Sequence, residues 1–283
     1  MKNKYIEQTM RLVFLAAACV SIAATITICI FLFANGVPAM LKIELKNFIF
    51  GLKWKPSIDL YGIFPMIVGS ITVTLGALIL GVPLGLFTAV FLARYCPKQL
   101  YNFFESGVKL LAGIPSVVYG FFGLTVIVPA IRNTFGGNGT SILAASIVLA
   151  IMILPTIISV SESSIRAVPS LYFEGSLALG ACKERSIFLV ELKAAKSGIM
   201  AGIILGVGRA VGETMAVIMV AGNQAILPRS LVKGIRTLTA NIVLEMGYAA
   251  DLHRDALIAT SVILFIFILI INLCFSLLKE KKE

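Results

Sequence analysis

The sequence contains few charged residues and a single histidine, and both shortages restrict what the chain can be. Only 13% of its 283 residues are charged while 59% are hydrophobic, whereas soluble domains carry about 25% charged residues. The lone histidine, His253, excludes a metal site built from several histidines, and we expect it to be a solvated loop residue. The five cysteines form no CxxC pair, so neither a disulfide framework nor a thiolate metal site is indicated. The composition predicts a membrane protein.

The net charge of +10 has two possible origins. In a soluble protein such an excess would suggest binding to nucleic acid. In a membrane protein, lysine and arginine next to apolar spans set the topology of the chain. We favour the second explanation and expect no nucleic acid partner.

Six apolar segments are long enough to cross a bilayer, which takes about 20 residues. They are residues 12–34, 66–93, 110–131, 141–161, 197–221 and 256–278. The first follows a basic start and could be a signal peptide, but its apolar run is longer than the usual ~7–15 residues of such signals. We therefore expect a retained anchor and an all-α membrane protein with six transmembrane helices.

The distribution of positive charge predicts that both termini are cytoplasmic. Six spans place the termini on one side, and the terminal tails with loops 94–106 and 162–196 hold more Lys and Arg than the opposite loops. We divide the chain into an N-terminal part (1–64), a five-helix core (65–278) and a short cytoplasmic tail (279–283). No extramembrane segment reaches the ~50 residues of a small domain, so any nucleotide hydrolysis must be performed by another chain.

The fifth span contains the stretch GVGRAVGETM, residues 206–215, with two charges near the middle of the membrane. Arg209 and Glu213 are four residues apart, so on a continuous helix they share a face and can form a pair. The same face carries Gly198, Gly202 and Gly206, a spacing that lets another helix approach closely.

Residues of a different kind fall on the opposite side of this predicted helix. They are Val207, Val211, Thr214 and Ile218, and we expect them to point outward. A phosphate-binding glycine loop is excluded, because it requires free N–H groups at the start of a helix in water, and those N–H groups are bonded within a membrane helix.

The charged pair allows two interpretations. It can be a structural salt bridge inside the membrane, or Arg209 can meet a transported anion while Glu213 holds it between transport events. Ionisable residues at membrane depth usually serve function, and a guanidinium offers planar paired donors that suit an oxyanion. We favour the transport interpretation.

The stretch GIPSVVYGFFG, residues 113–123, places Ser116 and Tyr119 at membrane depth beside Pro115. Prolines also occur in the second and fourth spans, at Pro83 and Pro155. Such residues either kink and pack the helices or mark a pathway or hinge, and the sequence leaves both options open.

The loop after the fourth span predicts a short helical hairpin on the cytoplasmic side. Pro169 suits the first turn of one helix, Gly180 can end it, and a second helix is expected over residues 183–192. Leu171, Leu177 and their apolar neighbours form an exposed ridge, which either lies on lipid or fills a groove of a partner protein.

This loop resembles the EAA loop of ABC importer permeases, whose pattern is E-A-A-x3-G-x9-I-x-L-P. Glu174 and Gly180 keep the acid, the glycine and their spacing, while Gly175 and Ser176 replace the alanines and Lys193 replaces the final proline. The stretch GVGRAVGETMAVIMVAGN, residues 206–223, is similar to the phosphate importer permeases of the PstC type, and residues 110–124 and 149–157 match as well.

The resemblance implies a type I ABC importer permease in a bacterial cytoplasmic membrane. Glu174, Gly175, Leu177 and Gly180 would form the coupling helix that docks onto an ATPase. Arg209, Glu213, Ser116, Tyr119 and Asn223 would line the substrate pathway. The implied partners are a PstA-like second permease, two ATPase subunits and an extracytoplasmic phosphate-binding protein, with membrane lipid around them. ATP would bind the ATPases, and this chain would bind no cofactor.

Three other functions are weighed against a phosphate permease. An ABC permease for molybdate or sulfate remains open, because an arginine does not choose its oxyanion. A secondary anion transporter is less favoured, because internal repeats are absent from the sequence and the hairpin would have no role. A membrane enzyme would need a nucleophile with a base, or a metal site, and the sequence offers neither.

Overall fold

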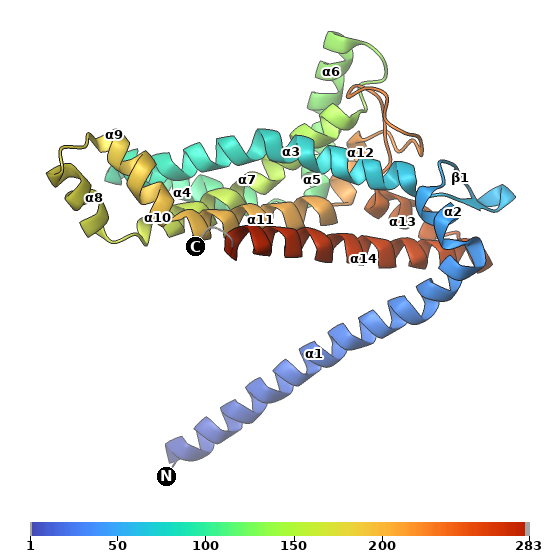
Figure 1. Cartoon of the computed structure of the whole chain (residues 1–283), viewed down its shortest axis with the longest axis horizontal. Coiled ribbons are helices and arrows are strands. Elements are labelled where there is room, and N and C mark those ends of the chain that lie inside the picture. The colour runs from blue at the N-terminus through green and yellow to red at the C-terminus, as the bar shows by residue number, and fades with distance from the viewer. Residues whose placement is uncertain (1, 281–283) are drawn as a thin grey trace.

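A computed structural model describes residues 2–280 of the protein, with side chains described for residues 7–274. Within these residues the chain is almost entirely helical, and the only sheet is an antiparallel hairpin of strands β1 (Trp54–Lys55) and β2 (Leu60–Tyr61). Long helices lie side by side in an elongated bundle (Figure 1). The short helices α8–α10 extend beyond one end of the bundle, and α2, the β hairpin and α13 lie at the other end. The predicted all-α membrane fold is confirmed.

The helices follow one another along the chain with short connections. The α-helices are α1 Lys2–Ile43, α2 Leu45–Phe50, α3 Phe64–Val90, α4 Lys98–Gly113, α5 Ser116–Phe122, α6 Val128–Phe135, α7 Ile142–Arg166, α8 Ser170–Ala178, α9 Lys183–Ser186, α10 Leu192–Ala194, α11 Lys196–Gly212, α12 Met215–Val220, α13 Leu238–Met246 and α14 Asp251–Glu280. A 3-10 turn, η1, covers Pro56–Ile58, and π-helical segments cover η2 Phe91–Tyr95, η3 Gly123–Ile127 and η4 Ile187–Glu191.

Among the described residues, five continuous helical stretches have the length and composition of membrane spans. They are Glu7–Ile43, Phe64–Tyr95, Ser116–Phe135, Ile142–Arg166 and Asp251–Cys274. The fifth predicted span, 197–221, is interrupted and consists of α11 and α12. Of the six expected transmembrane helices, five are therefore present as continuous stretches and the fifth predicted span is interrupted. Residues 281–283 of the predicted tail lie outside the described residues.

The third predicted span begins later than expected. Residues 110–113 belong to α4, a separate helix that covers most of the segment we had expected to be a loop. Pro115 explains the boundary, because a proline disfavours helical geometry in the residue before it, and Ile114 is extended with φ −70° and ψ 128°. Phe103 and Leu110 are each 73% exposed on α4, so this helix offers a strongly apolar surface outside the bundle.

Helix α7 is the most enclosed helix of the bundle and packs between α3 and α11. On the α11 side, Gly198 lies against Ser164, Gly202 against Val160 and Gly206 against Ile157. On the α3 side, Gly81 and Gly85 face Ile153 and Ile157 in the same way. Because these glycines have no side chain, both neighbours approach the α7 backbone closely, and dispersion contacts accumulate along its length.

The prediction that one face of α11 points outward is wrong for Val207 and Val211. Val207 is 2% exposed and Val211 is 5% exposed, although both were expected to point away from the bundle. Helix α11 contacts α3 and α14 in addition to α7, so its valine side is also covered. A helical wheel separates two faces but cannot count the neighbours that cover each of them.

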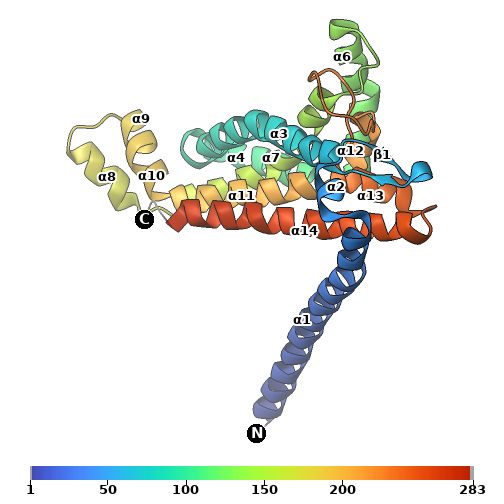
Figure 2. The same cartoon turned by 45° about the vertical axis from the view of Figure 1, so that its right-hand side comes forward.

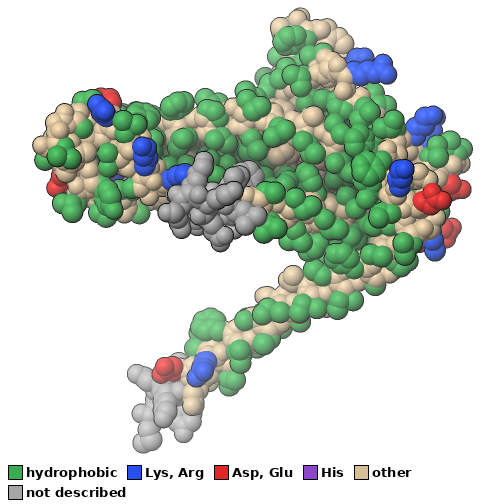
Figure 3. All heavy atoms as spheres, viewed as in Figure 1, with side chains coloured by type: hydrophobic (Ala, Val, Ile, Leu, Met, Phe, Trp, Pro, Cys, Tyr) green, Lys and Arg blue, Asp and Glu red, His purple; other side chains and the backbone are tan. Residues whose placement is uncertain are grey.

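Helix α1 diverges from the bundle in both views (Figures 1 and 2). Its C-terminal part packs on α14, where Gly36 meets Ala259 and Val262 and the rings of Phe33 and Phe265 are 6.1 Å apart. The most apolar stretch of α1 buries nothing within this chain. Hydrophobic side chains cover the long faces of the bundle and α1, while the charged side chains visible on this face lie toward the ends (Figure 3). This distribution is that of a multi-pass membrane protein.

Glu245 connects several elements at the end of the bundle that lies opposite α8–α10 and includes the β hairpin. Its carboxylate accepts hydrogen bonds from the indole of Trp54 at 2.7 Å and pairs with Arg236 at 2.5 Å and His253 at 2.9 Å. The expectation of a solvated loop histidine is wrong, because His253 lies in the first turn of α14 and its side chain is only 14% exposed. Aromatic rings of Trp54 and Tyr61 enclose it.

The close packing of α7 predicts a difference between two glycines of α11. A methyl group at Gly198 would meet Ser164, whereas a methyl group at Gly208 meets open space. We expect Gly198→Ala to lower the free energy of unfolding by ~1–3 kcal/mol, as overpacked cores do. Gly208→Ala should be neutral or stabilising by up to ~1 kcal/mol, because alanine favours the helix. Thermal unfolding of both variants in detergent measures the difference, and equal midpoints would contradict the packing argument.

Candidate functional site

The fifth predicted span is interrupted at Glu213 and Thr214, between α11 and α12. Glu213 is extended with φ −69° and ψ 133°, and its side chain accepts a hydrogen bond from the backbone N–H of Ala216 at 3.1 Å. The acid therefore caps the first turn of α12 and satisfies an N–H that would otherwise be unpaired in the membrane. From α13, the Thr239 hydroxyl donates to the Glu213 carbonyl at 3.0 Å.

This interruption separates the two charges that were expected to pair. Among the described side chains, no ion pair joins Arg209 to Glu213. The expected pairing requires a continuous helix, and the extended conformation of Glu213 removes the four-residue register. Arg209, in the last turn of α11, instead donates a long hydrogen bond to the Thr156 hydroxyl of α7 at 3.4 Å. Both charged side chains are only partly buried in the single chain.

Tyr119 lies on α5. The ring is buried, and its hydroxyl donates to the carbonyl of Leu111 at 2.7 Å, which holds the end of α4 against α5. Ser116 is the first residue of α5 and is half-buried. Helix α5 reaches α12 closely at Gly120, which contacts Ala216.

Asn223 lies apart from these residues, beyond the far end of α12. It follows Gly222 in a left-handed turn, with φ 52°, and donates to the carbonyl of Ile218 at 2.8 Å. Its own carbonyl accepts from Arg236 at 3.0 Å. The structure thus joins Asn223 to the Glu245 cluster at the end of the bundle.

Hydroxyl groups gather around the interruption. A small cavity beside Glu213 is lined by Ser70 and Thr74 of α3 and by Thr237 and Thr239 at the start of α13. These hydroxyl groups can donate hydrogen bonds, but Arg209 is not among the residues that line this cavity. Among the described residues, no group of His, Cys, Asp and Glu is arranged to hold a metal ion.

The hairpin after the fourth span has the form expected from the sequence. Helix α8 carries Glu174, Gly175 and Leu177, and it ends before Gly180, whose φ of +86° lies in the left-handed region that favours glycine. The second arm is helical from Lys183 through Ala194 and includes the π-helical segment η4. It continues two residues past the expected end at Leu192, as Lys193 allows where a proline would not.

The hairpin exposes apolar side chains at its tip. Leu171 is 75% exposed, Leu177 is 40% exposed and Leu179 is 91% exposed. Glu174 is exposed beside them. An exposed apolar ridge next to an acid is typical of a surface that a partner covers.

Sequence reasoning missed a second group of charged residues, where the hairpin joins the bundle. Arg94 pairs with Glu191, and Arg166 pairs with Glu162, which also accepts from the Tyr101 hydroxyl at 3.0 Å. Burial and this hydrogen bond raise the pKa of Tyr101 above its usual 10.0, so the phenol stays a proton donor at neutral pH. The available signal was Glu191 itself, an acid inside the apolar run IFLVEL.

Residues 81–281 match the family model of the binding-protein-dependent transport system inner membrane component. The chain belongs to this family. As a member it is a multi-pass ABC importer permease, a transport component rather than an enzyme. The resemblance drawn from the EAA-type loop and the fifth span is confirmed.

Curated relatives cover most of the permease. It is 38% identical over 96% of its length to a probable ABC transporter permease protein YqgH of Bacillus subtilis, of which it covers 92%. It is 34% identical over 80% of its length to the phosphate transport system permease protein PstC of Mesorhizobium japonicum, of which it covers 75%. A PstC of Pasteurella multocida is 33% identical over 84% of the permease and 81% of that protein.

Solved structures agree on the fold. The MetNI methionine ABC transporter in an inward-facing conformation aligns with a TM-score of 0.59 at 19% identity, over 82% of the permease and 100% of that chain. A bacterial ABC transporter for alginate aligns with a TM-score of 0.60 at 13% identity, over 94% of the permease and 96% of that chain. These similarities show the architecture of ABC importer permeases.

The turn of the hairpin predicts a contrast between two exposed glycines. Gly180→Ala places a side chain in a left-handed conformation, which costs ~1–2 kcal/mol. Gly175→Ala lies within helix α8 with open space around it and should favour the helix. We expect faster amide hydrogen exchange of residues 170–194 only in Gly180→Ala, and equal exchange in both variants would refute the role of the turn.

Proposed function

We propose that this permease carries inorganic phosphate across the bacterial cytoplasmic membrane by alternating access. The observation that carries the proposal is Arg209, a permanently charged guanidinium at the interruption of a membrane helix, with its side chain partly exposed. The PstC relatives of Mesorhizobium and Pasteurella support phosphate over molybdate or sulfate.

Arg209 suits the chemistry of this cargo. A guanidinium donates two parallel hydrogen bonds to an oxyanion and stays charged at membrane depth, where a lysine could lose its proton. The hydrogen bond from Arg209 to Thr156 is long, at 3.4 Å, so breaking it to bind an anion costs little free energy. Glu213 caps α12, and we assign it to holding the interruption open beside the pathway.

The other proposed pathway residues lie at two depths along the bundle. Ser116 and Tyr119 lie on α5, the helix that packs on α12 beside the interruption. Asn223 lies at the far end of α12, away from the hairpin, and we assign it to the entrance of the pathway from the outer side.

The permease would work with several partners. We expect a PstA-like second permease beside this chain, two ATPase subunits against the α8 hairpin, and a phosphate-binding protein at the opposite end. ATP would bind to the ATPases and no cofactor to this chain. The hairpin end would be cytoplasmic together with both termini, as the distribution of Lys and Arg indicates.

The pathway is tested by uptake of labelled phosphate into vesicles that contain the assembled complex and ATP. We expect Arg209→Ala to reduce uptake ~30-fold or more, because hydrogen bonds to a charged group contribute about 2 kcal/mol. Arg209→Lys keeps a charge but loses the paired donors, and should retain a measurable part of the uptake. Both variants should assemble normally.

Two results would oppose this assignment. Loss of assembly in Arg209→Ala would indicate a structural role for the guanidinium. If unlabelled molybdate or sulfate competes better than phosphate does in the wild-type complex, the cargo is a different oxyanion.

Docking of the ATPase is tested by reversing one charge on each arm of the hairpin. We expect Glu174→Lys to abolish ATPase association and uptake, while the permease still inserts into the membrane. Glu184→Lys makes the same charge change at an exposed position of the other arm and should leave association within about twofold of wild type, as exposed charges contribute little. Unchanged uptake in Glu174→Lys would exclude this helix as the docking element.

A further inference from the structure

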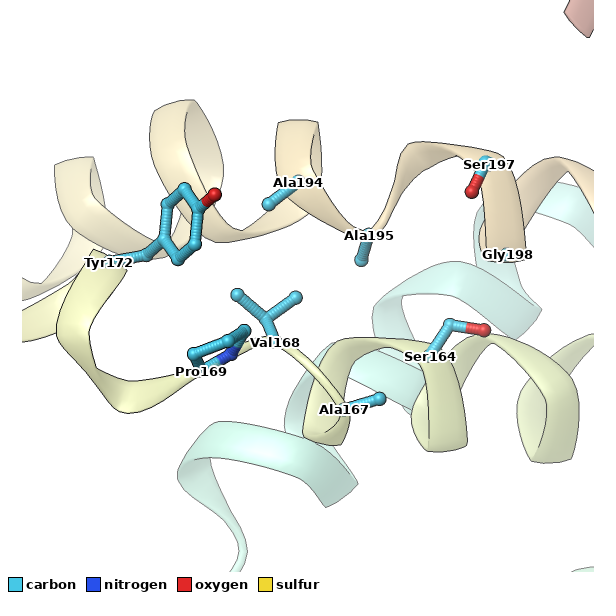
Figure 4. Close-up of a pocket in the computed structure, with 9 residues that line it drawn as sticks. All are labelled: Ser164, Ala167, Val168, Pro169, Tyr172, Ala194, Ala195, Ser197 and Gly198. Carbon is cyan, nitrogen blue, oxygen red and sulfur yellow. The ribbon is translucent and has the colours of Figure 1, made fainter.

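The hairpin is joined to the bundle by two arms that separate around a cavity. One arm runs from the end of α7 through Val168 and Pro169 into α8, and the other runs from α10 through Ala195 into α11. Side chains of both arms line a cavity of about 340 Å³ between them. Figure 4 shows the ring of Tyr172 standing across this space toward Ala194, while Ser164 and Gly198 lie close together at the other end.

A buried ion pair links the second arm to the bundle. The carboxylate of Glu191 receives the Arg94 side chain in a fork, with Nη2 to Oε1 at 2.7 Å and Nε to Oε2 at 2.9 Å. Nη2 of Arg94 also donates to the carbonyl of Ile165 at 2.8 Å. The pair therefore ties together η2 at the end of α3, the last turns of α7, and the hairpin.

Burial makes this pair costly to break. The Glu191 side chain is 2% exposed and that of Arg94 is 24% exposed, and Arg94 is the only cation that pairs with Glu191 among the described side chains. A buried carboxylate without its partner is strongly unfavourable. The two side chains should therefore move together.

The surroundings of the pair favour transmission of movement over simple anchoring. Arg94 and Glu191 both lie in π-helical segments, wide turns that interrupt regular helices and are frequent at functional sites. Beside them Ile187, which is fully buried, packs with Val90 and Ile165. Apolar contacts alone allow sliding, whereas a two-bond fork fixes direction as well as distance.

We infer that the Arg94–Glu191 pair is the joint that passes movement of the hairpin to α3 and α7. The cavity between the arms gives the first arm, which carries Glu174, room to shift. The fork makes the second arm move as one body with the ends of α3 and α7. Arg94 and Glu191 are positioning residues in this assignment, which rests on the proposed coupling of the hairpin to an ATPase.

The experiment measures uptake and ATP hydrolysis together in vesicles with the assembled complex. In Glu191→Gln and in Arg94→Lys, we expect uptake per ATP hydrolysed to fall about tenfold, within the ~5–150-fold range typical of coupling between sites. ATP hydrolysis itself should continue. The control is Glu105→Gln, which breaks the partly exposed pair with Lys109 on α4 and should leave the ratio unchanged.

A double variant separates positioning from stability. Arg94→Met with Glu191→Leu removes both charges at once, so that no buried charge is left alone. We expect it to assemble at the wild-type level and still show the loss of coupling. A normal ratio of uptake to hydrolysis in this double variant would overturn the inference, as would an equal loss of uptake and hydrolysis in the single variants.

A second readout does not depend on the cargo. Amide hydrogen exchange of the complex is compared with and without ATP bound. In wild type we expect ATP to change exchange both in residues 170–194 and at the ends of α3 and α7, whereas in Glu191→Gln only the hairpin should respond. If ATP still changes exchange at the ends of α3 and α7 in Glu191→Gln as it does in wild type, the role of the pair as a joint is overturned. A wild-type complex that carries no phosphate would refute the proposed cargo alone.

Discussion

The structure depends on the close contact of α7 with the glycine-bearing faces of α3 and α11. In lipid the hydrophobic effect does not drive helices together, so close packing has to supply the attraction. Glycines on both neighbours bring their backbones against α7 over most of its length. The three helices form a core from which the other elements extend, and both ends of this core carry polar clusters that fix its surroundings.

The core of α3, α7 and α11 holds the interruption between α11 and α12 in a fixed position. Where α11 gives way to α12, the hydrogen bonding of the backbone is taken over by the Glu213 side chain and by Thr239. Irregular backbone at membrane depth is tolerated where it is enclosed by protein or borders a polar cavity. Arg209 lies one turn before this point, so a fixed scaffold presents both a charge and a change in backbone geometry to the same region.

The sequence predicted the parts of the fold that depend on local composition. Apolar length located α3, α7 and α14, and Pro169 with Gly180 defined the hairpin to within a few residues. The interruption at Glu213 was not predictable, because a helix-compatible acid adopts an extended conformation only where its carboxylate finds the N–H of Ala216. The burial of Val207 and the pairing of His253 with Glu245 depend on neighbours that are distant in the chain. Likewise, the partners Arg94 and Glu191 are separated by 97 positions, beyond the reach of periodicity.

The length of α11 has a consequence for how the chain is made. Its 17 residues span about 26 Å at the usual rise of ~1.5 Å per residue, less than the ~30 Å of a hydrocarbon core, and they include a charged Arg209. Such a segment partitions poorly into lipid by itself. It needs a protein surface to insert against, and α7, whose Ser164, Val160 and Ile157 contact the α11 glycines, leaves the ribosome first. The order of helices along the chain therefore supplies a template during biosynthesis, and an interrupted helix can enter the membrane because its neighbour is already there.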